Sequence, residues 1–231
     1  MNQNLHASNR FISESSGINK RLWRSNLILL ISLFILIFIA PLLDHLSAFV
    51  TRSSLILVVV SGIYAAEYQK RIFYLLLSLG FMVIITTILM FIFPESRSIS
   101  VLAFLLMLSS LILSTIALIA HISVARSVER STIICAINSY LLLGLTASLL
   151  FIILDLINPS SFINLDMISG EISTYLYFGF VTLSTLGYGD ITPDAPLARS
   201  LSIFVAVAGQ LYLVIVMALI IGKYLNSERR K

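Results

Sequence analysis

The sequence has few charged residues and a single cysteine, and each scarcity excludes a class of protein. Asp, Glu, Lys and Arg make up only 11% of the 231 residues, whereas 58% are hydrophobic. A soluble domain carries about 25% charged residues. This chain therefore has too little polar surface to coat a globule in water, and its solvent must be largely lipid. The lone Cys135 excludes an intrachain disulfide and a cysteine-built zinc site.

Groups that could perform catalysis or hold a cofactor are also scarce. The three histidines, His6, His45 and His121, lie in separate segments at different expected membrane levels. No Ser/His/Asp or Cys/His constellation, metal-ligand cluster or phosphate loop stands out. We therefore predict that the chain is not an enzyme and needs no cofactor. The net charge of +4 does not indicate nucleic acid, because the basic residues form short runs between apolar stretches.

Long apolar stretches dominate the rest of the chain, and a helix needs about 20 apolar residues to cross a bilayer. The clear candidate spans are Asn26–Leu43, Ile72–Phe93, Ile99–Ile122, Thr132–Ile157 and Ala198–Tyr224. Leu46–Tyr68 is a weaker candidate because Arg52 interrupts it. Ile172–Leu183 is too short to span and reads as a re-entrant helix. The predicted fold is an all-α membrane protein with six transmembrane helices and a re-entrant pore helix between the fifth and sixth.

The distribution of Lys and Arg tests this six-span arrangement. With the N-terminus in the cytoplasm, the expected outside segments hold only Arg52, Arg97 and Arg199, and the other twelve basic residues lie inside. Such a bias is typical of membrane proteins. Omitting the weak second span would invert every later segment, so the bias supports that span as well as the orientation. We expect an integral protein of the cell (inner or plasma) membrane with both termini cytoplasmic.

This reading divides the chain into three parts. Residues 1–25 form a cytoplasmic N-terminal segment, residues 26–125 a four-helix transmembrane domain, and residues 126–231 a pore-type domain. The last part contains the short apolar helix and the loop that follows it.

The residues after the short helix, Thr185-Leu186-Gly187-Tyr188-Gly189, cannot comfortably continue a helix. Non-helical backbone at membrane depth is tolerated only where it is buried in protein or lines a water-filled path. Glycines at 187 and 189 allow successive carbonyls to point to one side, and four such strands around an axis would give stacked rings of oxygens that replace a cation's hydration shell. The carbonyl end of the short helix would add partial negative charge there.

The run from Phe180 to Asp190, FVTLSTLGYGD, resembles the pore signature of the potassium channel family. The resemblance implies a homotetramer in the lipid bilayer, with K+ as the permeant ion and partner. It also implies coordination of K+ by backbone carbonyls, with the filter at Thr185–Gly189. The K+-binding positions it assigns are Thr185, Leu186, Gly187 and Tyr188.

Side chains around this segment have expected roles of their own. Leu186 and Tyr188 should point away from the axis and brace the strand against the short helix, with Tyr177 and Phe178 as packing partners. Asp190 abuts the filter at the outer mouth. The acidic residues expected around that mouth are Asp155, Asp166, Glu171, Asp190 and Asp194, and fourfold symmetry would multiply their attraction for cations.

The last span carries two candidate gating residues. Gly209 lies 24 residues after Thr185, near the position of an inner-helix hinge in channels that this sequence resembles. Glycine is an easy place to bend a helix, but it also permits close helix packing. Gln210 either faces a water-filled cavity below the filter or hydrogen-bonds to a neighbouring helix.

The fourth span, Ile99–Ile122, contains no Arg or Lys. Voltage sensing needs several gating charges in a mobile helix, so we predict a channel without voltage gating. His121 near its cytoplasmic end is either a pH sensor or an ordinary interface histidine. The alternatives to a K+-selective channel are a non-selective cation channel and, less favoured because the chain has no repeated halves, a secondary cation transporter.

Overall fold

The computed structural model describes residues 21–43, 47–125, 128–164 and 172–228. Most of the predicted N-terminal segment lies outside these residues, as do His45, Asp166 and Glu171. The helical elements are the first segment Arg21–Leu42, α2 (Ser47–Ala65), α3 (Lys70–Ile92), α4 (Arg97–Val124), α5 (Arg130–Ile157), α6 (Ile172–Leu183) and α7 (Pro196–Glu228).

Five of these helices are long and apolar enough to cross a membrane: the first segment, α3, α4, α5 and α7. The apolar part of α2 is shorter, covering Val50–Ala65. The all-α membrane architecture is therefore supported, whereas the sixth span and the re-entry of α6 stay predictions. The short helix has the bounds expected from its apolar stretch, Ile172–Leu183.

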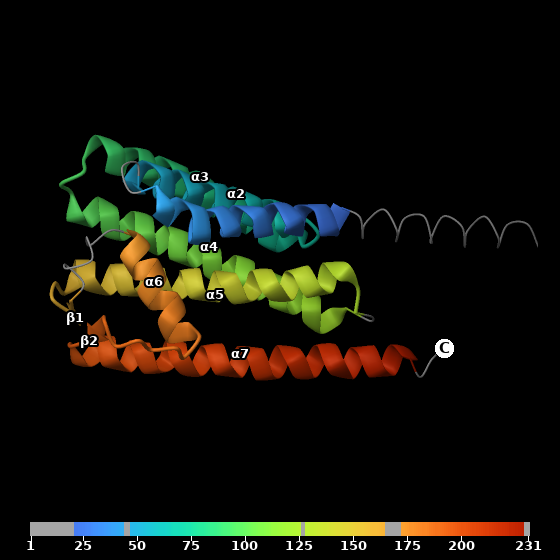
Figure 1. Cartoon of the computed structure of the whole chain (residues 1–231). Coiled ribbons are helices and arrows are strands. Elements are labelled where there is room, and N and C mark those ends of the chain that lie inside the picture. Colours follow the sequence, from blue (N-terminus) through green and yellow to red (C-terminus); the bar gives the residue numbers. More distant parts are fainter. Residues whose placement is uncertain (1–20, 44–46, 126–127, 165–171, 229–231) are drawn as a thin grey trace, which may run out of the picture.

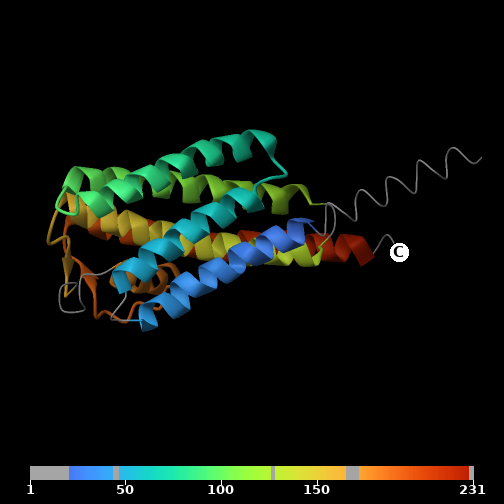
Figure 2. The same cartoon turned by 90° about the horizontal axis from the view of Figure 1, so that it is seen from above.

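The helices lie roughly side by side, with α2 and α3 along one edge of the bundle and α7 along the opposite edge (Figure 1). In sequence order, α3 packs along α4 and α4 packs along α5. The short α6 contacts both α5 and α7, and it lies at one end of the bundle in both views (Figure 2). This placement holds the segment after α6 against the last helix.

The first helical segment changes its winding near Pro41. A π-helical turn, η1 (Ile35–Ile39), is followed by a 3-10 turn, η2 (Ala40–Leu42). Proline has no N–H and its ring collides with the carbonyl four residues earlier, so the regular α-helical ladder cannot pass Pro41. The π-turn is the wider winding that accommodates this interruption.

Polar side chains inside the bundle are hydrogen-bonded between helices. The Ser32 and Ser61 hydroxyls are 2.8 Å apart, which links the first segment to α2. Asn138 Nδ2 donates to the carbonyl of Asn26 at 2.8 Å and links α5 to the first segment. Such bonds satisfy polar groups that water cannot reach, and they join the early helices to the part of the chain that follows.

Candidate ion-conduction site

The segment after α6 turns back onto the carbonyl end of that helix. The amide of Thr185 donates to the Thr182 carbonyl at 3.0 Å, and the amides of Leu186 and Gly187 both donate to the Val181 carbonyl at 3.0 and 3.3 Å. Carbonyls at the end of a helix lack intrahelical partners, and here the filter backbone supplies some of them. The partial negative charge of the helix end is thereby held next to the candidate filter.

The backbone alternates along the candidate filter. Thr185, Gly187 and Gly189 have φ angles of 60°, 55° and 81°, whereas Leu186 and Tyr188 between them do not have positive φ. The left-handed region is open to glycine but costs a side-chain-bearing residue about 1–2 kcal/mol. The alternation expected from the two glycines is therefore present, and it extends one step further, to Thr185.

Thr185 is held in this unfavourable conformation by its own hydroxyl. Its Oγ1 donates to the Ser184 carbonyl at 2.7 Å and accepts from Gln210 Nε2 of α7 at 3.1 Å. The positive φ of Thr185 and its bond to Gln210 were both missed by sequence reasoning. The first could have been inferred from the same alternation argument, since a strand with carbonyls on one side needs left-handed residues at every second position.

Gly209, the residue before Gln210, is buried against the end of α6. A methyl group added there would lie 2.2 Å from the carbonyl oxygen of Leu183 and 3.0 Å from its Cδ1. The α7 helix runs without interruption through this residue. The geometry favours the packing role of Gly209, and its role as a hinge stays a prediction.

Tyr188 and Asp190 are both tied to Tyr177 of α6. The rings of Tyr177 and Tyr188 are stacked, with centroids 6.5 Å apart and planes 7° from parallel. The Tyr177 hydroxyl donates to Asp190 Oδ2, and this hydrogen bond lowers the pKa of Asp190, aided by the amide of Ile191. Asp190 is exposed, so it presents a carboxylate at the end of the candidate filter.

Phe178 was predicted to pack against the filter strand together with Tyr177, but its ring contacts lie elsewhere. Phe178 is buried, and its ring contacts Phe151 of α5 and Phe162 of β1 (Phe162–Ile163), with centroids 4.7 and 5.3 Å apart. The helical step between Tyr177 and Phe178 turns the two side chains to different faces of α6. Of these two side chains, Tyr177 stacks on Tyr188 of the candidate filter, and Phe178 anchors α6 to the bundle.

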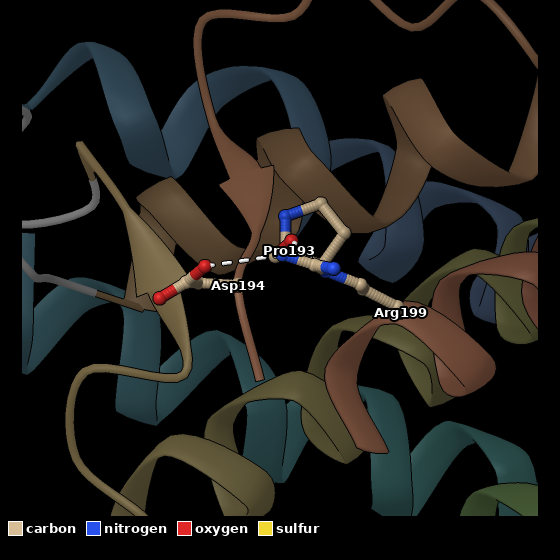
Figure 3. Close-up of polar contacts among 3 residues, drawn as sticks. All are labelled: Pro193, Asp194 and Arg199. Carbon is tan, nitrogen blue, oxygen red and sulfur yellow. Dashed lines mark hydrogen bonds and ion pairs between the residues drawn. The ribbon is translucent and has the colours of Figure 1, made fainter. Parts of the chain in front are cut away.

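Like Asp190, two more of the acidic residues expected at the outer mouth, Asp155 and Asp194, have partners within the chain. Arg199 Nη2 lies 3.2 Å from Asp194 Oδ1, and Arg199 Nε donates to the Pro193 carbonyl at 3.3 Å (Figure 3). Asp155 accepts a hydrogen bond from the Tyr175 hydroxyl at 2.7 Å. The ion pair with Arg199 offsets the charge of Asp194, whereas the tyrosine hydroxyls that bond Asp155 and Asp190 leave those carboxylates charged.

A short strand pair positions this mouth. The strands β1 and β2 (Thr192–Pro193) pair in antiparallel fashion, with Phe162 opposite Pro193. The amide of Asp194 also donates to the Ser161 carbonyl at 2.8 Å. The segment that follows the candidate filter is thus fastened to the loop after α5.

Comparison with known families agrees with this geometry. Residues 139–226 match a family model described as an ion channel. The match begins within α5 and ends within α7, so it contains α6, the candidate filter, Gly209 and Gln210, but it covers less than half of the chain. No curated protein and no solved structure matches the sequence.

The match and the long apolar helices together define the class of protein. They support an ion-channel subunit that is integral to a membrane. The helices that end before residue 139 lie outside the matched residues.

Proposed function

We propose that the chain is the subunit of a homotetrameric, K+-selective channel with Thr185–Gly189 as its filter. The observation that carries this proposal is the alternation of left-handed residues at 185, 187 and 189, anchored to the carbonyl end of α6. A backbone that alternates in this way directs its carbonyls toward one side, which suits the replacement of a cation's hydration shell. Asp190 lies at the outer end and the Thr185 hydroxyl at the inner end.

The exposure of this region supports assembly with further copies. Leu186 and Tyr188 are 55% and 67% exposed in the single chain, and Ile203, Phe204 and Val214 of α7 are 64–66% exposed. A filter backbone keeps its geometry only if its side chains are held by packing against neighbours. In the proposed tetramer, neighbouring subunits supply that packing, and four filters surround one axis.

Ion replacement tests selectivity directly. Purified protein is reconstituted in planar bilayers with K+ on one side and Na+ on the other. We expect single-channel currents whose reversal potential follows the K+ gradient. Comparable Na+ and K+ currents would favour the non-selective cation channel, and transport that saturates at a low turnover without unitary currents would favour a transporter. The oligomer is tested separately by native mass spectrometry, where the proposal requires about four times the chain mass of 25.6 kDa.

We further propose that this channel is not gated by voltage. Arg97 is the first residue of α4, and no other Arg or Lys occurs in that helix. Arg97 Nε donates to the Leu156 carbonyl of α5, so the only cation of α4 is fastened at its end. In symmetric K+ we expect open probability to change little with potential. A steep, saturating Boltzmann curve equivalent to several gating charges would contradict this.

A further inference from the structure

A cavity of about 330 Å³, with charged side chains set among apolar ones, lies where the first helical segment begins and the α2–α3 turn passes it. Its walls include Arg21 of the first segment, Tyr64 of α2, Glu67 of the turn and Lys70 of α3. The cavity lies at the end of the bundle near which α7 also ends (Figure 1). The filter lies at the other end, so the cavity is separate from the candidate conduction site.

The charge of this cavity is positive. Arg21 Nη2 lies 2.6 Å from Glu67 Oε1, which neutralises one cation but uses only one of the five guanidinium donors. Lys70 makes no hydrogen bond or ion pair with any residue that the structure describes. Arginine and lysine are the usual ligands of phosphate oxygens in proteins, so the cavity suits a phosphate group.

An apolar groove of about 680 Å³ adjoins the cavity at Tyr64, which lines both. The groove runs between α2 and α3 and is lined by side chains from Val60 and Ile63 to Phe73, Leu77 and Ile84. From Phe73 to Ile84 an α-helix rises about 16 Å. That length is about half of the ~30 Å hydrocarbon core, which is the depth of one leaflet.

The faces beside the groove are built for lipid. Tyr74 and Phe81 of α3 are 66% and 67% exposed, and α3 lies at the edge of the bundle opposite α7 (Figure 1). Gly80 lets the helices approach closely at the floor of the groove, since a methyl group there would lie 2.5 Å from Ile63 Cδ1. A cationic cavity at the membrane surface thus continues into an apolar groove that is one leaflet deep.

We infer that this composite site binds an anionic glycerophospholipid. The phosphate is held by Arg21 and Lys70, and one acyl chain lies in the groove between α2 and α3. The net positive charge selects an anionic over a zwitterionic headgroup, because the positively charged amine of the latter would face Arg21 and Lys70. The site belongs to the helices that precede the matched ion-channel region, so it does not depend on what the pore conducts.

Native mass spectrometry of the purified full chain tests the inference with phosphatidylglycerol and phosphatidylcholine of identical acyl chains. We expect preferential retention of phosphatidylglycerol, reduced about tenfold in Lys70→Gln, because a charged hydrogen bond contributes on this order. Lys70→Gln leaves the Arg21–Glu67 ion pair in place. Arg24→Gln is the matched control, because Arg24 is exposed on the same end of the bundle but does not line the cavity.

A groove variant separates the lipid from a free anion. Ser78→Phe fills the groove from an exposed position without touching the charged cavity, and we expect it to weaken phosphatidylglycerol retention while circular dichroism and elution volume stay unchanged. Equal retention of the two lipids, or undiminished retention in Lys70→Gln, would overturn the inference. Thermal stabilisation by inorganic phosphate equal to that by the lipid would also overturn it. None of these readouts involves ion conduction, so a failure of the pore proposal leaves the result interpretable.

Discussion

A few glycines lie at helix contacts both in the pore part of the chain and in the helices before it, but those compared below meet different atoms. In the pore part, Gly179 of α6 abuts the backbone and hydroxyl of Ser148, where an added methyl group would lie 2.2 Å from Oγ and 2.9 Å from the amide nitrogen. Gly209 abuts the Leu183 carbonyl at 2.2 Å, as described above. These neighbours include main-chain atoms of Ser148 and Leu183, which cannot move without displacing α5 or α6.

The glycines of the early helices meet softer neighbours. A methyl group at Gly62 would lie 3.0 Å from the Ser114 hydroxyl, and one at Gly80 would meet the terminal methyl of Ile63. A hydroxyl or a terminal methyl can change rotamer at low cost. The difference indicates that α6 is held more rigidly between its neighbours than the early helices are held against one another. That difference suits the proposed filter after α6 and the proposed lipid site on the early helices.

The largest effect is expected from Gly187→Ala in the filter. The φ of 55° at Gly187 costs alanine about 1–2 kcal/mol, which is small for a whole subunit but falls on the backbone that would coordinate the ion. We expect selective K+ current to be lost while the oligomer persists, as measured by bilayer recording and native mass spectrometry. Gly222→Ala is the control, since its added methyl group meets nothing within 4 Å. Selective current in Gly187→Ala would disprove the filter assignment.

The next largest effect is expected from Gly209→Ala, which separates the two roles of this residue. If Gly209 is needed for packing against Leu183, overpacking destabilises the protein by about 1–3 kcal/mol. If it serves only as a hinge, alanine in mid-helix stabilises by about 0.5–1 kcal/mol and alters gating alone. We expect a lower thermal unfolding temperature than in Gly222→Ala. An unfolding temperature of Gly209→Ala equal to or higher than that of Gly222→Ala would favour the hinge role of Gly209.

The same contrast explains how far the sequence alone could reach. The end of α6 at Leu183 was predicted correctly, because its largely apolar stretch stops there, shortly before Gly187-Tyr188-Gly189. The first span was predicted to begin at Asn26, but its helix begins no later than Arg21. A helix can continue through polar residues, because its backbone hydrogen bonds do not depend on apolar side chains. A prediction based on hydropathy therefore leaves out the polar helical turn before Asn26.

Contacts across the fold could not be predicted in the same way. The bond between Gln210 and Thr185 and the bond between Tyr177 and Asp190 depend on the rotation of α7 and α6 about their axes. The composition of a nearly uniform apolar helix does not fix that rotation, because there is little polar face to orient it. The sequence therefore left Gln210 between a cavity and a neighbouring helix, and it gave Phe178 the wrong packing partner.

A smaller effect is expected at Lys223, where the two regions meet at the end opposite the filter. Its Nζ donates to the carbonyls of Ile122 and Ser123, the latter at 2.9 Å, at the end of α4. Cations at a helix C-terminus satisfy orphan carbonyls and the dipole. We expect Lys223→Met to cost about 1 kcal/mol and to change open probability, with the K+/Na+ permeability ratio unchanged. Lys223→Arg should restore open probability, and unaltered gating in Lys223→Met would argue that the early helices are not coupled to α7.

The smallest effect is expected from Tyr177→Phe, which removes only a hydroxyl. In the native chain the Tyr177 hydrogen bond holds the pKa of Asp190 below its ordinary value. The carboxylate therefore stays charged as the pH falls through about 4, where an ordinary aspartate gains a proton. Its contribution to stability is likewise present above the unfolded-state pKa and is lost as the pH falls through the lower folded-state value. Without the hydroxyl, the pKa of Asp190 in the folded chain rises. The loss of its negative charge and the loss of its contribution to stability then both begin at a higher pH.

The measurement is unitary conductance at low K+ concentration, titrated from neutral pH downward. We expect the decline to begin at a higher pH in Tyr177→Phe than in the native channel, because the outer-mouth charge that concentrates K+ is neutralised sooner. Asp190→Asn provides the reference, with low conductance and no decline in this range. Superimposable curves for the native channel and Tyr177→Phe would place the relevant charge elsewhere. Asp194 would then be the next candidate despite its ion pair with Arg199, because that exposed pair is worth little and is screened by salt.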